Sequence, residues 1–326
     1  MHEPRTTMSR RDVLRTFGAG AALTAFSGVS LAGAQPAATA GRKRSIRVAH
    51  MTDPHIQPER DAVAGVAACL HHIQSQADKP ALLLTGGDHV MDAFEEPFER
   101  ADLQWKLLCK SFKDENSLPV RYCLGNHDIW GWNKGKSKTT GSESGWGKTM
   151  SLDRLELKKP YYSFDAGGWH FVVLDSVRVD PDDPNGYVGG LDDEQFEWLR
   201  GDLAANRTVN TLFLTHIPIL SVSVLDTKVD KNMDMRVGGG VIYTDWPRVK
   251  RLMQENTQVK CVLSGHMHRI DRVEFLGVTH LCNGAVSANW WKGRHYETGE
   301  GYALVDLYDD GSVERQYVEF GWKARP

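Results

Sequence analysis

Short apolar runs alternate with amphipathic stretches through the first half of the chain. The runs that predict buried strands cover 45–51, 81–85, 120–124, 211–215 and 259–263. Residues 60–77 carry apolar side chains at helical spacing, and a second helix is predicted at 94–112. Strands that alternate with helices and end at polar loops predict an α/β fold with a largely parallel sheet.

The second half of the chain is richer in strand patterns. Residues 161–165 and 170–175 alternate around Gly167-Gly168, which predicts a hairpin. Helices are expected at 191–205 and 246–255, with an irregular segment between them at 217–243. The remainder predicts strands at 271–283, 302–308 and 312–320.

Residues 129–160 interrupt this rhythm. Trp130, Trp132 and Trp146 lie among glycine, serine, threonine and lysine, which is typical of a long loop. Loops of this length are usually binding loops or lids. Because tryptophan side chains are costly to leave in water, we expect this insertion to be a lid.

Composition narrows the class of protein. The chain has 326 residues, of which 41% are hydrophobic, and this suits one large domain or two small ones. The formal net charge of −3 gives no reason to expect nucleic acid or an anionic membrane as a partner. The five cysteines form no CxxC pair, and Cys69, Cys123 and Cys261 lie in apolar runs. Buried thiols are the simpler interpretation, with a single disulfide left open if the chain is exported.

The N-terminus resembles a twin-arginine export signal. Arg10-Arg11 precedes a weakly apolar run from Thr16 to Gly33, and small residues at 32–34 offer a cleavage point. Val13 and Arg15 depart from the usual Phe and Lys of this signal. The alternative is a basic N-terminus beside an alanine-rich helix. We expect residues 1–34 to be removed by the twin-arginine machinery, leaving a periplasmic or secreted domain at 35–326. The run is short and glycine-rich for a permanent membrane anchor.

Polar side chains that suit metal binding follow five of the predicted strands. In chain order they are Asp53 and His55; Asp88, after Gly86-Gly87; Asn126, His127 and Asp128; His216; and His266 and His268. A single histidine at such a place is often structural, and a lone aspartate is often a turn residue. Five strand ends of this kind favour one shared site, because the carboxyl ends of parallel strands meet at one sheet edge.

The residue types indicate the kind of site. Carboxylate, imidazole and amide oxygen suit Mn, Fe, Zn or Ni, and the absence of cysteine argues against a structural zinc–thiolate site. The candidates exceed one tetrahedral shell, so two metal ions that share a carboxylate are the economical interpretation. Asp88 is the natural bridge, since its glycines allow a close approach.

With these residues in place, the chain resembles a calcineurin-like metallophosphoesterase. The family motifs D-x-H, G-D-x-x-D, G-N-H-D, a lone H and G-H-x-H correspond to 53–55, 87–92, 125–128, His216 and 265–268. The resemblance covers nearly all of the mature chain and implies a four-layer α-β-β-α sandwich. It assigns one divalent or trivalent ion to Asp53, His55, Asp88 and His268, and the second ion to Asp88, Asn126, His216 and His266. No tyrosine stands where the tyrosinate–iron subtype has one.

The resemblance also implies a mechanism in which two metal ions bind the phosphate and activate a water for in-line attack. His127 would protonate the leaving alkoxide, with Asp128 holding its imidazole. His89 and Asp92 either support the ligands or only begin a helix. Further candidates for substrate contact, or for a loop that packs its own aromatic rings, are Trp290, Trp291, Arg294 and His295.

The predicted function is an exported two-metal phosphoesterase acting on a small-molecule phosphomonoester or phosphodiester. Within this class, the chain most resembles the cyclic-nucleotide-phosphodiesterase-like branch. A nuclease is disfavoured because the sequence has no dense stripe of Lys and Arg. The alternative of another class is a metal-containing protein that binds a ligand without turnover.

Overall fold

The computed structural model describes residues 41–183, 185–226 and 235–324, and the predicted leader at 1–34 lies outside them. A first sheet has the strand order β13–β12–β1–β2–β3. Its strands are β1 (Arg44–Met51), β2 (Leu82–Thr85), β3 (Val120–Tyr122), β12 (Gly301–Tyr308) and β13 (Val313–Glu319). β1, β2 and β3 run parallel, whereas β12 runs antiparallel to both of its neighbours, β1 and β13. The strands predicted at 45–51, 302–308 and 312–320 therefore share one sheet.

A second sheet has the order β10–β11–β9–β8–β5–β4. Its strands are β4 (Tyr162–Ala166), β5 (Trp169–Val173), β8 (Thr211–Leu214), β9 (Val259–Ser264), β10 (Asp271–Phe275) and β11 (Val278–Cys282). β5, β8, β9 and β11 are parallel, and the hairpin partners β4 and β10 flank them in antiparallel orientation.

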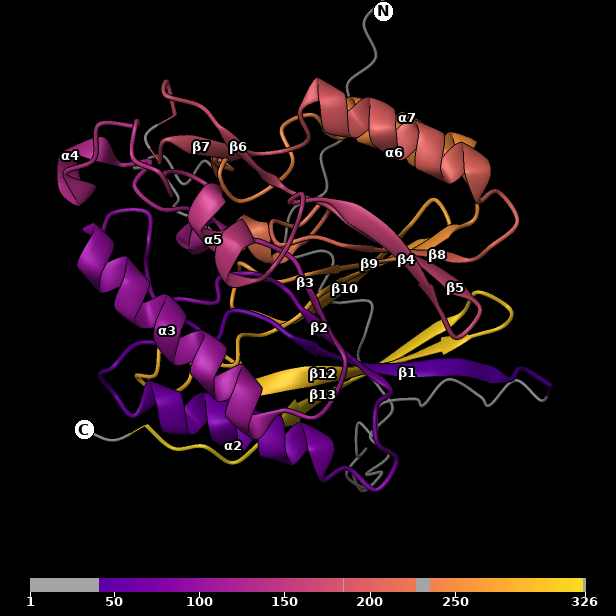
Figure 1. The fold of residues 1–326 in the computed structure, drawn as a ribbon. Coiled ribbons are helices and arrows are strands. Elements are labelled where there is room, and N and C mark those ends of the chain that lie inside the picture. Colours follow the sequence, from indigo (N-terminus) through magenta and orange to yellow (C-terminus); the bar gives the residue numbers. More distant parts are fainter. Residues whose placement is uncertain (1–40, 184, 227–234, 325–326) are drawn as a thin grey trace, which may run out of the picture. The chain divides into compact units, whose positions relative to one another are not determined.

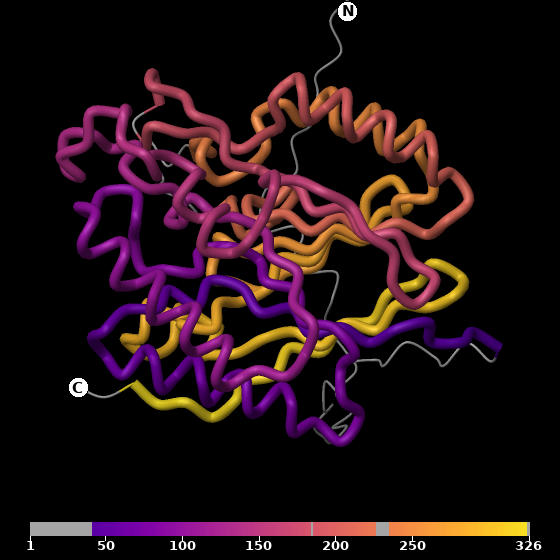
Figure 2. The backbone as a smooth tube through the Cα atoms, in the orientation of Figure 1, coloured from indigo at the N-terminus to yellow at the C-terminus, as the bar shows by residue number. Residues whose placement is uncertain are grey.

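Helices cover the outer face of each sheet. In Figures 1 and 2, α2 (Ala62–Gln74) and α3 (Phe98–Glu115) lie against the first sheet, and α6 (Asp193–Ala205) and α7 (Trp246–Glu255) lie on the far side of the second. The predicted four-layer α-β-β-α sandwich is therefore confirmed. The layering follows from the sequence, because strands that are apolar on both faces need cover on both faces.

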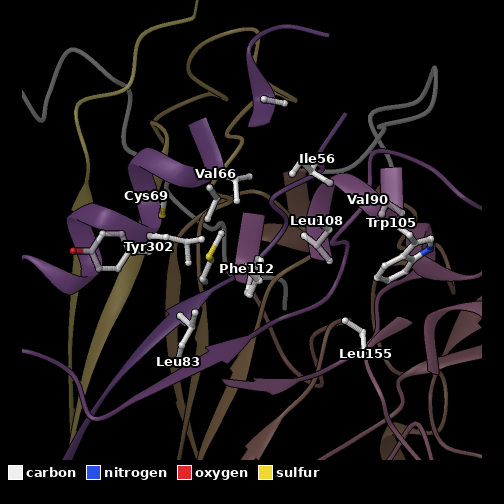
Figure 3. Packing of buried hydrophobic residues seen from close by; sticks show 14 of the residues in the cluster. Ile56, Val66, Cys69, Leu83, Val90, Trp105, Leu108, Phe112, Leu155 and Tyr302 are labelled. Carbon is white, nitrogen blue, oxygen red and sulfur yellow. The ribbon is translucent and has the colours of Figure 1, made fainter. Parts of the chain in front are cut away.

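Three apolar clusters fill the three spaces between the four layers. Under α2 and α3, Val66 and Leu108 belong to one cluster with Leu83 of β2 (Figure 3). Between the sheets, Leu84 of β2 shares a cluster with Phe171 of β5. The third cluster packs α6 and α7 onto the other face of the second sheet. Side chains that alternate along β2 thus belong to two different cores, as the two-residue period of a strand requires.

The insertion at 129–160 is more ordered than a plain loop. It contains two short helices, α4 (Lys134–Ser137) and α5 (Thr149–Arg154), and Trp130 is buried with its Nε1 donating to the carbonyl of Glu96. A small sheet of β6 (Val177–Val179) and β7 (Tyr187–Gly189) is a further element that the pattern did not predict. Strands of three residues carry too little alternation to be recognised. Motion of the insertion as a lid stays a prediction.

All five cysteines are free thiols, and every one except Cys109 is buried. Over the described ranges, no helix combines the length and the apolar character needed to cross a membrane.

Candidate metal centre

The seven predicted ligands converge from both sheets. The strands β1, β2 and β3 of the first sheet and β8 and β9 of the second end on the same side of the sandwich (Figure 1). The loops that follow these strands bring together side chains up to 215 positions apart, since His268 lies 3.4 Å from Asp53 between Nε2 and Oδ1. Residues that are far apart in the sequence therefore lie in one shared site.

One cluster consists of Asp53, His55 and His268, all buried. The Nε2 atoms of the two histidines are 3.1 Å apart. A second cluster consists of Asp88, His216 and His266. His216 Nε2 lies 3.1 Å from Nδ1 of His266.

Asp88 joins the two clusters, and Asn126 completes the second. Asp88 Oδ2 is 3.2 Å from Nε2 of His216 and 3.6 Å from Nε2 of His55. Asn126 Oδ1 lies 3.1 Å from the same nitrogen of His216. Two groups of ligand atoms that share one carboxylate oxygen are the arrangement of a binuclear metal site.

The hydrogen bonds of two of the ligand imidazoles leave their Nε2 atoms free to bind a metal ion. His216 donates from Nδ1 to the carbonyl of Gly86 at 2.7 Å, and His268 donates from Nδ1 to the carbonyl of Ala288. In each ring the Nε2 lone pair therefore points into the cluster. A backbone acceptor that fixes the tautomer in this way is common behind metal-bound histidine.

The protonation states of the ligand side chains also suit the binding of metal cations. Burial lowers the pKa of His55 and of His266 to about 3, so both rings are neutral donors at pH 7. Burial disfavours ionised Asp53, but its hydrogen bond with His268 outweighs burial and holds the pKa of Asp53 below its usual value. Burial likewise opposes charge on His216, yet Asp88 raises the pKa of this imidazole to about 9. The second cluster thus stabilises a positive charge, which a bound metal ion would supply in place of the proton.

Strained backbone positions five of the seven ligands. Positive φ angles occur at Asp53 (53°), His55 (42°), Asp88 (51°), His266 (69°) and His268 (54°). This region of φ is uncommon for residues with a side chain, and it clusters at functional sites. Five of the seven ligands share this strained conformation, which is consistent with a site whose side chains are held in place by their loops.

Two glycines allow the ligand loops to touch. A Cβ at Gly125 would clash with Oδ1 of Asp88, and one at Gly265 would clash with Thr52 and Asp53. Oδ1 of Asp88 also accepts a 2.8 Å hydrogen bond from the backbone N–H of His127. The glycines of the two motifs are thus required by close packing around the carboxylates.

His127 stands at the rim of the clusters, with its ring centroid 4.9 Å from that of His55. Burial disfavours its charged form, but Asp88 and Asp92 outweigh burial and raise the pKa of His127 to about 9. The carboxylate nearest to its imidazole is that of Asp92, with Oδ1 3.7 Å from Nδ1. The same Oδ1 of Asp92 accepts the backbone N–H of Phe94 at 2.7 Å, so Asp92 both faces His127 and holds a turn.

The prediction that Asp128 holds the imidazole of His127 is wrong. Asp128 is buried and accepts hydrogen bonds from Nδ1 of His89 at 2.9 Å and from the backbone N–H of Gly125 at 2.8 Å. Residues 126–128 form a 3₁₀ turn, η1. Successive side chains of such a turn point about 120° apart, so His127 and Asp128 face different ways. His89 and Asp128 instead tie the loop after β2 to the loop after β3.

Only part of the segment 290–295 reaches the site. Trp290 lies with its ring 4.5 Å from that of His268, and His295 lies 5.8 Å from the same ring. Trp291 was a candidate for substrate contact or for a loop that packs its own rings, and it is neither: it is fully buried and donates from Nε1 to the carbonyl of Pro54 at 3.0 Å. It supports the Asp53–His55 loop from the core. Arg294 forms an ion pair with Glu319 at 2.8 Å, so its charge is directed to that carboxylate.

Sequence reasoning missed Thr52, whose hydroxyl donates to Oδ2 of Asp53. Nothing separates this residue from any other strand-end threonine until the carboxylate beside it is known as a ligand. It also missed Tyr187, which lines a cavity together with Asn126 and His127. The only local signal there is the Asn185-Gly186 turn.

Two joined clusters of carboxylate and imidazole at one edge of a four-layer sandwich place this protein in the class of metal-dependent hydrolases. The model of the calcineurin-like phosphoesterase family matches residues 46–269. The chain belongs to this family, and it is a metal-dependent phosphoester hydrolase. The family uses two metal ions, in agreement with the two ligand clusters.

Relatives agree with this assignment. A "probable cyclic nucleotide phosphodiesterase" of Synechococcus is 25% identical over 287 residues, which cover 85% of this chain and 93% of the relative. A protein of the same description from Rhodococcus erythropolis is 22% identical and covers 81% and 80% of the two chains. Among solved structures, a dimetal phosphatase from Danio rerio has the same fold, with a TM-score of 0.59, 15% identity and coverage of 85% and 98%.

Proposed function

We propose that the protein is an exported two-metal phosphoesterase that hydrolyses small organic phosphodiesters, with phosphomonoesters as the second substrate class. The observation that carries the proposal is the position of Asp88. Its Oδ2 lies within 3.6 Å of a histidine of each cluster, so one carboxylate can hold two cations together. A structural metal site needs no such sharing.

The distances support the ligand sets that the resemblance implies. The first ion would be held by Asp53, His55, Asp88 and His268, and the second by Asp88, Asn126, His216 and His266. When bound, the ions would neutralise the phosphate and activate a water for in-line attack. Mn, Fe, Zn and Ni all suit these donors.

His127 supplies the proton in this proposal. Its imidazole lies beside the first cluster and is 30% exposed, and in the metal-free protein the carboxylates of Asp88 and Asp92 raise its pKa to about 9, which favours the protonated form. A charged imidazole at this place stabilises the phosphoryl oxygens and donates a proton to the leaving oxygen. A positioned general acid typically contributes about 10²- to 10⁴-fold in rate.

The preference for a diester rests on the relatives. Both are described as "probable cyclic nucleotide phosphodiesterase" and align over at least four-fifths of this chain. The chain itself has a formal net charge of −3, which favours a small ester over a nucleic acid as substrate.

The decisive experiment is turnover by the purified protein loaded with Mn or Zn. Bis(p-nitrophenyl) phosphate should be hydrolysed with a higher kcat/KM than p-nitrophenyl phosphate, and a chelator should abolish both activities. His127→Asn should retain two metal ions per chain and lose about 10²-fold or more in kcat. A fully metallated protein that hydrolyses neither ester would refute the proposal.

Export is the second part of the proposal. It is supported by the order of the paired arginines, the apolar run and the small residues before Gln35. The twin-arginine route carries folded proteins, which suits a metal site assembled from residues across the whole domain. Replacement of Arg10 and Arg11 by lysine should trap the precursor in the cytoplasm, and fractionation with an antibody to the mature domain would show it. Unchanged export of this variant would rule out the route.

A further inference from the structure

The metal centre is in contact with a segment that lies beyond the family match. The family model ends at residue 269, and the chain continues through β10 and β11 into a turn at 285–291, which we call the brace. Val286, Ser287 and Trp291 of the brace are fully buried. Buried polar groups need hydrogen-bond partners, and those of the brace lie beside the first cluster.

The brace fixes all four backbone carbonyls of residues 52–55. Val286 donates from its backbone N–H to the first of these carbonyls at 2.9 Å. Ser287 donates from its hydroxyl to the second at 2.8 Å. The indole Nε1 of Trp291 is shared between the third and the fourth, at 3.0 and 3.2 Å. Two of the three residues of the first cluster belong to this stretch, so their backbone cannot rotate without breaking these hydrogen bonds.

The brace also holds the third member of the first cluster, His268. The carbonyl of Ala288 accepts a hydrogen bond from Nδ1 of His268. The Trp290 ring lies 4.5 Å from the His268 ring and 5.9 Å from the His55 ring, measured between centroids. The His268 imidazole is thereby fixed at Nδ1 and packed against an indole, with its Nε2 directed at Asp53.

The brace is held in a conformation that its own residues disfavour. Ala288, Trp290 and Trp291 have positive φ angles of 44°, 49° and 66°. Such angles persist only where the surrounding packing determines them. Part of this packing comes from α2, where a Cβ at Gly65 would overlap the Trp291 ring. Glycine weakens the interior of a helix, and here it is what allows the indole to reach the ligand loop.

The second cluster receives no such support from the brace. Across the described residues, the hydrogen bonds of 285–291 include none to Asp88, Asn126, His216 or His266. The second cluster instead borders a cavity that Asn126 helps to line. The two ion sites therefore have different surroundings, one held by the brace and the other next to the cavity.

We propose that the brace positions the ligands of the first ion and selectively strengthens the binding of that ion, with Ser287, Trp290 and Trp291 as positioning residues. This role rests on the two-metal site of the proposed function. Ligands that are held in place before binding lose less conformational freedom when the ion arrives. Groups that hold metal ligands in this way typically change metal affinity by about 10- to 100-fold.

The test is a competition titration of Mn between the protein and a fluorescent chelator, with one site disabled at a time. His216→Ala disables the second site, and His268→Ala disables the first. Trp291→Phe keeps a ring in the core but removes the N–H donor. In the His216→Ala background it should raise the dissociation constant of the remaining ion about 10- to 100-fold, and in the His268→Ala background it should leave that constant unchanged. In the otherwise intact chain it should weaken the binding of one ion of the two.

Ser287→Ala and Trp290→Leu should act in the same direction as Trp291→Phe, so the proposal does not depend on the folding of a single variant. Trp169→Phe is the matched control, because Trp169 is fully buried in β5 and its Nε1 donates to the carbonyl of Tyr308 at 3.0 Å. This control should lower the melting temperature of the metal-free protein about as much as Trp291→Phe does, and it should leave both metal affinities unchanged.

The outcomes separate the brace from the proposed function. An equal loss of affinity in the two backgrounds would show that Trp291 supports the whole fold, and it would overturn the selective role. An unchanged affinity in the His216→Ala background would overturn it as well. Selective loss in a protein that hydrolyses no phosphate ester would support the brace and refute the proposed function, whereas hydrolysis without selective loss would refute the brace alone.

Discussion

Asp88 and Asp92, and not Asp128, raise the pKa of His127, and the contribution of Asp92 can be measured. In Asp92→Asn the negative charge 3.7 Å from Nδ1 of His127 is lost while the amide oxygen that caps the Phe94 turn is kept. Coulomb's law gives about 4 kcal/mol for two unit charges at this distance with an effective dielectric constant of about 20. The His127 and Asp92 side chains are 30% and 21% exposed, so solvent screening reduces this to about 1–2 kcal/mol, or roughly one pKa unit.

The assay is the pH dependence of kcat/KM on bis(p-nitrophenyl) phosphate. A general acid must be protonated to act, so the rate falls as the pH rises through its pKa. We expect the alkaline limb to begin about one pH unit lower in Asp92→Asn than in wild type. Asp128→Asn should leave this limb in place and reduce thermal stability, because the buried Asp128 carboxylate accepts hydrogen bonds from His89 and Gly125. A limb that moves in Asp128→Asn and stays in Asp92→Asn would refute the reasoning.

Three further predictions follow from the packing around the site and from one distant histidine. Asp88→Asn should lower metal content from two ions per chain to less than one, as measured by atomic emission, because both clusters lose their shared charge; two retained ions would contradict its bridging role. Gly265→Ala should reduce metal affinity at least tenfold in a competition titration, since the new Cβ displaces Asp53, and an unchanged affinity would show that the loop can adjust. His170 is buried, which disfavours its charge, but hydrogen bonds to Asp202 and a second carboxylate outweigh burial and raise its pKa. The stabilising effect of protonated His170 is complete below the unfolded pKa of about 6.5 and is lost as the pH rises through the higher folded pKa. His170→Asn should therefore lower the free energy of unfolding, measured with denaturant, by about 1–2 kcal/mol at pH 5.5 and by less at pH 9. An equal loss at both pH values would exclude this account.

Local patterns predicted the layers and the ligand loops because each depends on contacts within one strand and its neighbours. The run Leu82 to Leu84 is apolar at every position, which requires cover on both faces, and the structure buries it between two cores. The ends of the parallel strands then place Asp53, Asp88 and His216 at one edge for purely topological reasons.

What the sequence did not predict depends on directions within turns and on contacts between distant segments. The partner of His127 is decided by a 3₁₀ turn that rotates Asp128 away, and a turn of three residues has no periodic signal. Trp291 follows Trp290 directly, yet one ring lies beside His268 and the other in the core. Phe94 and Tyr187 lie in different segments, and no spacing along the chain indicates that their rings meet.

The most direct test of the account is a crystal structure of the Mn-loaded protein with anomalous scattering recorded at the manganese edge. We expect two peaks on either side of Oδ2 of Asp88, one next to His55 and His268 and the other next to His216 and His266. A single peak, or peaks away from Asp88, would contradict the claim that one carboxylate joins two metal ions in this protein.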